Sequence, residues 1–125
     1  MKELTKAEEQ VMQKLWELGK TNVKSIIELM SEPKPAYNTV STIVRILENK
    51  GFVDHEKLGK GYVYFPLVSK EAYKKVYMKR FMSNYFQDSF KNMVSFFAKE
   101  DKMDINDLEE LLNDVKKDLD EKSED

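Results

Sequence analysis

One short segment of the chain carries side chains that can read the edges of DNA bases. They recur at helical spacing, so they would share one face of an α-helix: Asn38, Ser41, Thr42 and Arg45. Arginine can form two hydrogen bonds with guanine, asparagine can do the same with adenine, and a threonine methyl group can touch thymine. The segment is therefore either a base-reading surface or an ordinary solvated helix face.

Side chains around this face are candidates for contacts with the phosphate backbone. Tyr37 could touch a phosphate or pack on the preceding helix, and the Thr39 hydroxyl could touch a phosphate or bond only to its own helix. Lys57 and Lys60 flank a glycine-rich turn, where their ammonium groups would either contact phosphates or be solvated. We count all four among the candidate DNA-binding residues.

The composition gives little support to catalysis or to a bound metal. The chain has no cysteine, which excludes a disulfide framework, a thiolate metal site and a cysteine nucleophile. His55 is the single histidine, and we interpret it as a partly exposed strand residue. Because no carboxylate pair, no nucleophile with a neighbouring base and no phosphate-binding loop stands out, we expect no enzyme activity, no metal site and no cofactor.

Apolar periodicity predicts two helices ahead of the candidate face. The first begins at Thr5, which stands three residues before a glutamate as in a capping box, and it ends at Gly19. The second begins at Thr21 or Asn22. It ends before Ser31, because the residue preceding a proline is pushed out of helical geometry.

The candidate face itself belongs to a third predicted helix, which is followed by two strands. The helix begins at Ala36 or Asn38, although its many β-branched residues make a strand the competing local prediction. Residues 52–56 and 62–65 read as strands that are joined by a turn at 58–61. The helical interpretation depends on one apolar stripe: Val40, Ile43, Val44 and Leu47.

This order of elements predicts a mainly α protein with a small β-wing. Residues 1–68 would form a winged helix-turn-helix DNA-binding domain, and residues 69–125 a helical dimerisation region with an acidic C-terminal tail. Helical spacing runs from residue 69 to a break near Lys102, and a short heptad seam follows. Candidate dimerisation residues are Tyr77, Phe81, Phe90, Ile105, Leu108, Leu112 and Val115.

The charge of the chain is unevenly distributed. The net charge is −2, from 21 basic and 23 acidic residues, which taken alone argues against nucleic-acid binding. However, residues 33–70 carry a net charge of +3 and residues 100–125 carry −8. No apolar run approaches the roughly 20 residues of a membrane span, and the first residues lack a signal-peptide core. We therefore expect a cytoplasmic protein with a basic body, an acidic tail and no membrane insertion.

Three segments together resemble the penicillinase-repressor family of bacterial transcription regulators, over almost the whole chain. They are LTKAEEQVMQKLW, TVSTIVRILENKGFVDHEKLGKGYVYFPLVS and SFFAKEDKMDINDLEELL. The resemblance implies a homodimeric winged-helix repressor that binds double-stranded operator DNA of two-fold symmetry. It also implies displacement from the operator when a membrane sensor metalloprotease is activated.

The chain departs from that family at three points. Ile46 stands where the family commonly has an arginine, and Phe96-Phe97 stands where the best-known members are cleaved after an asparagine. The chain also lacks the cysteine motif of the copper-responsive branch. We hypothesise that cleavage near Phe96 and Phe97 releases the operator. The alternative function is a winged-helix protein-interaction module that does not bind DNA, which Ile46 and the acidic net charge would suit.

Overall fold

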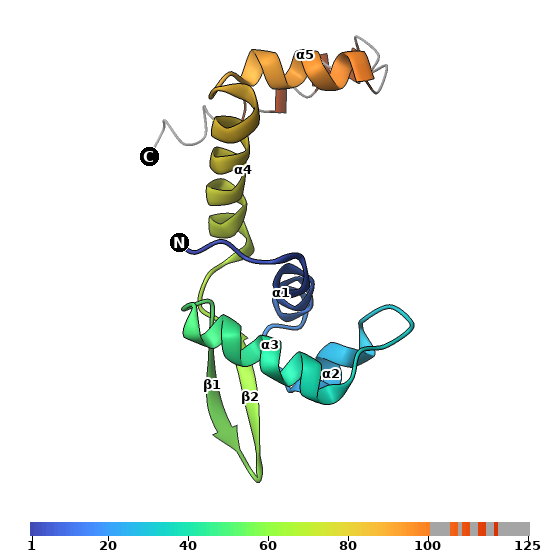
Figure 1. The fold of residues 1–125 in the computed structure, drawn as a ribbon, viewed down its shortest axis with the longest axis vertical. Coiled ribbons are helices and arrows are strands. Elements are labelled where there is room, and N and C mark those ends of the chain that lie inside the picture. Colours follow the sequence, from blue (N-terminus) through green and yellow to red (C-terminus); the bar gives the residue numbers. More distant parts are fainter. Residues whose placement is uncertain (101–105, 108, 111–112, 115–116, 118–125) are drawn as a thin grey trace. The chain divides into compact units, whose positions relative to one another are not determined.

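The computed structural model describes residues 1–100, 106–107, 109–110, 113–114 and 117. Its elements are labelled in Figure 1. The order confirms the expected mainly helical fold with one antiparallel hairpin, an arrangement consistent with a winged helix. The elements are α1 (Lys6–Leu18), α2 (Val23–Glu28), α3 (Tyr37–Asn49), β1 (Val53–Leu58), β2 (Gly61–Pro66), α4 (Lys70–Phe86) and α5 (Phe90–Glu100).

Local capping fixes where α1 begins and ends. The Glu8 backbone N–H donates to Thr5 Oγ1 at 3.2 Å, and the Thr5 N–H donates to Glu8 Oε1 at 3.3 Å. This reciprocal pair is the predicted capping box. At the other end Gly19 adopts a φ of 77°, and its N–H donates to the Leu15 carbonyl at 2.7 Å. Glycine is suited to this place because a positive φ costs it nothing.

The loop that follows α2 is held by a lysine. Asn22 is the N-cap of α2, since its Oδ1 accepts a hydrogen bond of 2.8 Å from the Ser25 N–H. The helix ends at Glu28, ahead of the predicted end at Ser31. Lys34 Nζ donates to the carbonyls of Glu28 and Met30 at 2.9 and 2.8 Å. Its ammonium group therefore supplies hydrogen bonds that the backbone N–H groups of a further helical turn would otherwise have given.

The three N-terminal helices and the hairpin enclose one hydrophobic core. α3 is a helix and not a strand, and its N-cap is Ala36. The apolar residues of α3 recur at helical spacing and therefore form one stripe, which is buried against α1 and α2. The fully buried side chains are Val11, Met12, Leu15, Ile26, Val40, Val44, Leu47, Phe52 and Val53.

The beginning of α4 also belongs to this core. Tyr73 is buried, with its ring centroid 5.5 Å from that of Trp16 and 6.0 Å from that of Phe52. Trp16 Nε1 donates to the Val68 carbonyl at 2.8 Å, which fixes the chain just before α4. The chain divides into two compact units, Met1–Val76 and Tyr77–Asp125, and the division falls within α4. The predicted boundary at residue 68 lies ahead of these contacts.

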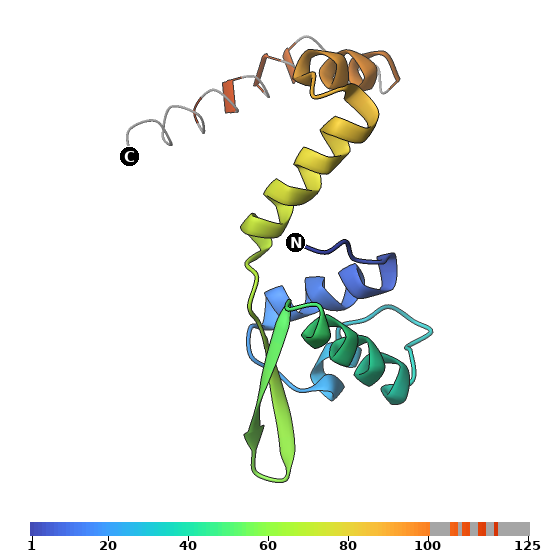
Figure 2. The same ribbon diagram turned by 60° about the vertical axis from the view of Figure 1, so that its left-hand side comes forward.

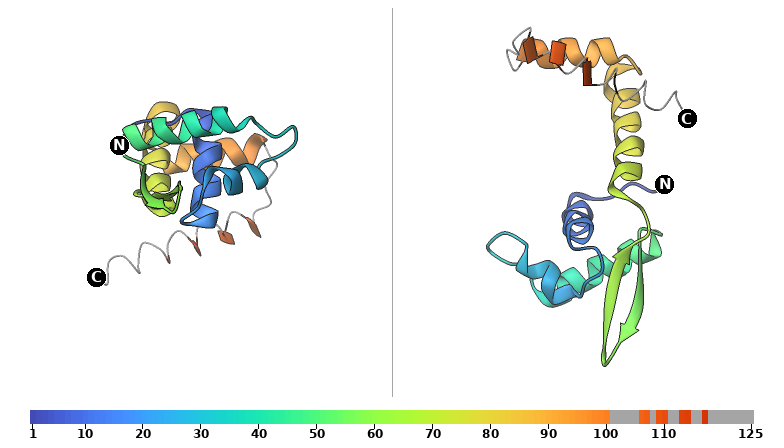
Figure 3. Two further views of the ribbon diagram at one scale, coloured as in Figure 1. Left: turned by 90° about the horizontal axis from the view of Figure 1, so that it is seen from below. Right: turned by 180° about the vertical axis from the view of Figure 1, so that it is seen from behind.

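The hairpin is a regular two-stranded ladder with a short turn. Val53 pairs with Pro66 and Leu58 pairs with Gly61, which leaves Gly59 and Lys60 as the turn. Gly59 has a φ of 63°, as the first position of a two-residue hairpin turn requires. Figures 1 and 3 show this turn at the end of the hairpin farthest from the three helices.

A third extended segment joins the hairpin at its base. The Thr21 N–H donates to the Tyr64 carbonyl at 2.9 Å, and the Tyr64 N–H donates to the Thr21 carbonyl at 2.7 Å. This bridge ties β2 to the connection between α1 and α2. Figure 2 shows that connection passing the hairpin on its way to α2. It was not predicted, because a single bridging residue has no periodicity of its own.

Between Lys70 and Glu100 the structure has two helices, α4 and α5, where one continuous helical stretch was predicted. α4 ends at Phe86, and Gln87 and Asp88 adopt φ values of 52° and 63°. Ser89 Oγ then accepts a hydrogen bond of 3.1 Å from the Asn92 N–H and begins α5. The prediction of an unbroken helix through this region was therefore wrong, since two consecutive residues with positive φ end an α-helix.

Some predicted features fall on parts of the chain outside the described residues. They are the break near Lys102 and the dimerisation positions Ile105, Leu108, Leu112 and Val115. Within the residues that are described, none of the helices combines the length and the apolar character needed to span a membrane.

Candidate nucleic-acid interface

α3 presents one continuous exposed face. Successive residues of an α-helix point about 100° apart, so the exposed residues of α3, apart from Tyr37 in its first turn, fall on one arc opposite its buried stripe. We call this arc the recognition face. In order around the helix it contains Arg45, Asn38, Asn49, Thr42, Ile46 and Thr39.

Ser41 does not belong to the recognition face. Its side chain is only 8% exposed, and it lies on the inner side of α3 next to Val44. Ser41 precedes Thr42 by one residue, so the two side chains point about 100° apart. Sequence spacing alone placed Ser41 with the polar residues, whereas the structure buries most of its surface.

Thr42 uses its hydroxyl within its own helix. Thr42 Oγ1 donates to the Asn38 carbonyl at 2.8 Å, a bond that serine and threonine often form with the preceding helical turn. The hydroxyl carries a single proton, so Thr42 cannot donate the same proton to a base. What it can offer to a DNA base is its methyl group and an acceptor lone pair.

The beginning of α3 is open to solvent. Ala36 caps the helix without a side-chain hydrogen bond, and Tyr37, Asn38 and Thr39 are all exposed. Of the alternatives for Tyr37, packing on the preceding helix finds little support, because 58% of its surface is exposed. The first backbone N–H groups of α3 accordingly have no capping side chain.

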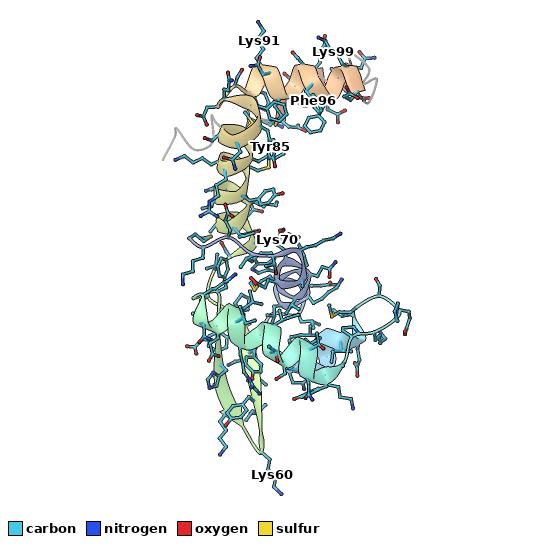
Figure 4. All side chains as sticks on the ribbon, in the orientation of Figure 1. Lys60, Lys70, Tyr85, Lys91, Phe96 and Lys99 are labelled. Carbon is cyan, nitrogen blue, oxygen red and sulfur yellow. The ribbon has the colours of Figure 1, made fainter. Side chains whose placement is uncertain are left out.

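Lys57 and Lys60 are exposed on the hairpin. Lys60 occupies the second position of the turn and extends outward from the tip in Figure 4. Lys57 pairs with Tyr62 across the ladder, so their side chains lie on the same side of the hairpin. Both ammonium groups are free to meet a phosphate, since no ion pair of either lysine occurs among the described residues.

A hydrogen bond between side chains joins the hairpin to the end of α3. His55 Nδ1 lies 2.6 Å from Glu48 Oε2, and the His55 ring contacts the rings of Tyr62 and Tyr64 at centroid distances of 5.3 and 5.9 Å. Partial burial raises the pKa of Tyr64 above its usual value, and the negative charge of Glu48 raises it further. These contacts fix the angle at which the hairpin leaves the recognition helix.

The opposite side of the hairpin is held by a lysine. Lys20 forms an ion pair with Glu56, and its Nζ lies 5.4 Å from the centroid of the Phe65 ring. Glu56 and Phe65 belong to the two strands, whereas Lys20 follows α1. The hairpin is therefore supported on both of its sides.

One group of residues brings possible metal ligands together. Among the described residues, Glu48, Asp54 and His55 have ligand atoms within 4.8 Å of one another. Two of these ligand atoms already take part in hydrogen bonds. His55 Nδ1 contacts Glu48, and Asp54 Oδ1 accepts a hydrogen bond from the His55 backbone N–H at 2.7 Å. We assign these residues to the support of the hairpin.

The second unit carries an aromatic cluster in α4 and α5. The Phe86 ring lies 5.5 Å from that of Phe81, 5.7 Å from that of Phe96 and 6.4 Å from that of Phe97. Phe81 and Phe90 are half-buried, and Tyr77 is 48% exposed. Phe96 is also exposed, and the bond between Phe96 and Phe97 lies within α5.

The structure adds three residues to the candidate interface. Asn49 and Ile46 belong to the recognition face, and Tyr62 is exposed on the hairpin beside His55. A signal for each was present in the sequence. Asn49 continues the polar spacing, Ile46 lies outside the apolar stripe of its helix, and Tyr62 alternates with Tyr64 along a strand.

Comparisons with known proteins agree with this arrangement. The profile of a family described as "Penicillinase repressor" matches residues 4–117. The methicillin resistance regulatory protein MecI of Staphylococcus aureus strain N315 is 29% identical over 112 residues, covering 89% of this chain and 91% of that protein. The penicillinase repressor of Bacillus licheniformis is 26% identical over 118 residues, covering 91% and 92%.

A solved structure is similar only at a low level. A chain of the Giardia lamblia Hop2-Mnd1 complex aligns with 94% of this chain and 80% of its own length, at 12% identity and a TM-score of 0.38.

Proposed function

Because the chain belongs to the penicillinase-repressor family, we propose that it is a dimeric repressor whose α3 enters the major groove of a two-fold symmetric operator. Its relatives MecI and the penicillinase repressor, which match most of the chain, support a role in transcriptional repression. A role on DNA also implies a cytoplasmic location in a bacterium.

The recognition face is the observation that carries this proposal. The apolar side of α3 is buried in the core, so the exposed face with Arg45, Asn38 and Asn49 is the side of the helix that a partner can contact. These are the side-chain types that pair with guanine and adenine in the major groove. Ser41 is buried and lies outside the recognition face. Thr42 and Ile46 complete the set of exposed side chains that would face base edges.

The hairpin would position the protein on the phosphate backbone. Lys60 at its tip and Lys57 on β1 are exposed cations, and contacts of this type fix the register of a protein on DNA without reading sequence. Tyr37 and Thr39 lie exposed at the beginning of α3, where hydroxyl groups and free backbone N–H groups suit a phosphate. Binding should therefore weaken steeply as salt is added.

The second unit would supply the dimer contact. Tyr77, Tyr85 and Phe96 expose large apolar surfaces, and soluble monomers seldom expose many such groups together. Association with a second copy would cover them, and two-fold symmetry is the usual result. Phe81 and Phe90 would contribute from the same two helices.

Release of the operator would follow from cleavage in α5 by a membrane sensor metalloprotease. The bond between Phe96 and Phe97 is inside a helix, so α5 must unfold locally before a protease can bind it. Cleavage there would divide the aromatic cluster, because Phe97 would leave with the acidic C-terminal segment while Phe86 and Phe96 stay with the DNA-binding half. The mass of the protein recovered from cells during derepression tests this step. A fragment that ends at Phe96 supports it, and persistence of the intact chain contradicts it.

Selection of DNA from a random double-stranded library tests the main proposal. We expect the full chain to enrich a two-fold symmetric sequence, and to migrate with that sequence in a gel shift as a complex of two chains per site. If no sequence is enriched and binding to bulk DNA is absent, the winged-helix unit serves as a protein-interaction module instead.

A further inference from the structure

The recognition face has two chemically different edges. One edge consists of Arg45, Asn38 and Asn49, whose guanidinium and amide groups form hydrogen bonds. The other edge consists of Thr39, Thr42 and Ile46, at spacing i, i+3 and i+7, and each of its members carries a methyl group. If this helix lies in the major groove, it can present hydrogen-bonding groups along one edge and apolar methyl groups along the other.

Two residues of the second edge offer carbon to a base. The Thr42 hydroxyl proton is occupied by the Asn38 carbonyl at 2.8 Å, which leaves the Thr42 methyl as its apolar group. Ile46 is 38% exposed and has neither a donor nor an acceptor. Ile46 therefore cannot recognise the hydrogen-bonding edge of guanine or adenine.

The major groove presents one apolar group that distinguishes a base, the 5-methyl group of thymine. Burial of the exposed part of Ile46 against that methyl would be favourable, because apolar area leaves water. Four residues advance about 6 Å along a helix axis, and bases of one strand are about 3.4 Å apart. Thr42 and Ile46 can thus address methyl groups within about two base steps.

We propose, on the basis of the function above, that Ile46 is a specificity-determining residue that together with Thr42 reads a thymine 5-methyl group in each operator half-site. The polar edge of α3 would then select its bases by hydrogen bonds, and the methyl edge would select thymine by contact. Arg45 and Ile46 would act on different positions of the same half-site.

Replacement of thymine by deoxyuridine tests this, because it removes the 5-methyl group and leaves every hydrogen-bonding atom in place. The operator selected by the full chain is synthesised with one thymine at a time replaced, at the equivalent position of both half-sites. We expect one or two positions at which affinity falls about fourfold for each methyl removed, the effect of about one buried carbon group.

Protein variants connect that loss to Ile46. Ile46→Ala should lower affinity for the thymine operator and show a smaller further loss than wild type on the deoxyuridine operator at the sensitive position, because the two changes act on one contact and only the Thr42 methyl remains. Asn49→Ala is the matched control, since Asn49 shares the face but offers an amide. It should lower affinity equally on both DNAs. Thermal unfolding of each variant checks that the helix is intact.

Two results would overturn the inference. One is a wild-type chain that binds every deoxyuridine operator as tightly as the thymine operator. The other is an Ile46→Ala variant that keeps the full preference for thymine. Failure of the proposed function looks different, because then the wild-type chain selects no operator at all.

Discussion

Lys50, directly after the last residue of α3, forms an ion pair with Glu8 in the first turn of α1. The pair is largely buried, with the Lys50 and Glu8 side chains 23% and 5% exposed. Lys50 Nζ also donates to Glu8 Oε2 and to the Glu3 carbonyl, both at 3.1 Å. The carboxylate that completes the α1 capping box therefore also fixes the end of the recognition helix.

Glu8→Gln should destabilise the first unit. Removal of one partner of a buried ion pair leaves the other charge without compensation, which costs roughly 3–5 kcal/mol when burial is complete. Because Lys50 retains some exposure, we expect a loss of about 2 kcal/mol in the free energy of unfolding by urea. Glu9→Gln is the matched control, since Glu9 is in the same helical turn and forms no ion pair among the described residues. Equal losses in the two variants would contradict the assignment.

The same pair should make stability depend on acid pH. Burial by itself would raise the pKa of Glu8, but hydrogen bonds from Lys50 and Thr5 and the positive charge of Lys50 hold it below its ordinary value of 4.5. A carboxyl group with a lowered pKa stabilises the fold above its unfolded value, and that contribution is lost as the pH falls through the folded value.

Urea unfolding of the wild type and Glu8→Gln between pH 7 and pH 3 measures this effect. The difference between the two proteins should be constant at neutral pH and shrink below about pH 4.5, where the unfolded carboxyl becomes protonated. A difference that grows on acidification would show that the native pKa of Glu8 is raised.

Arg45→Lys should separate base reading from charge. Lysine keeps the positive charge but loses the planar fork that pairs with guanine. We expect base discrimination at one position per half-site to fall by about 1–3 kcal/mol, while the dependence of affinity on salt stays the same. Binding of a panel of single-base operator variants gives both quantities. Unchanged discrimination would remove Arg45 from the set of base contacts.

Lys60→Ala should have the opposite pattern. A lost phosphate contact weakens binding to every sequence and reduces the slope of log K against log salt by about 0.9. Base preference should not change, because phosphate contacts carry no direct sequence information. Lys99→Ala in α5 serves as the control for loss of one positive charge. If Lys60→Ala has no effect on the slope, the tip of the hairpin is not on the DNA backbone.

Sequence reasoning succeeded where the determinants are local. The Thr5 capping box, the Asn22 alternative for the second cap and the presence of a turn within residues 58–61 each depend on a few neighbouring residues. Their energies come from hydrogen bonds and φ preferences that neighbouring residues determine. The apolar stripe of α3 was equally readable, because burial on one side of a helix requires it.

Sequence reasoning failed where distant segments decide. Nothing near Tyr73 in the sequence indicates that its ring packs on Trp16 and Phe52, or that the first compact unit extends to Val76. The break at Gln87 and Asp88 was missed because neither residue is a glycine. Ser41 was misplaced because the spacing of polar residues does not show where a buried stripe ends.

Tyr77→Ala should weaken the proposed dimer and leave the first unit folded. Tyr77 lies in the second unit and is 48% exposed within one chain, so about half of its surface is available to a second copy. Tyrosine is often among the few interface residues that contribute most of the binding energy. We expect the dimer dissociation constant to rise at least about tenfold, equivalent to about 1.4 kcal/mol, in sedimentation equilibrium measurements. Lys79→Ala, an exposed polar change in the same helix, is the control. A wild-type chain that remains monomeric at micromolar concentration would contradict the proposed dimer. A Tyr77→Ala variant that dimerises as tightly as wild type would show that the dimer contact lies elsewhere.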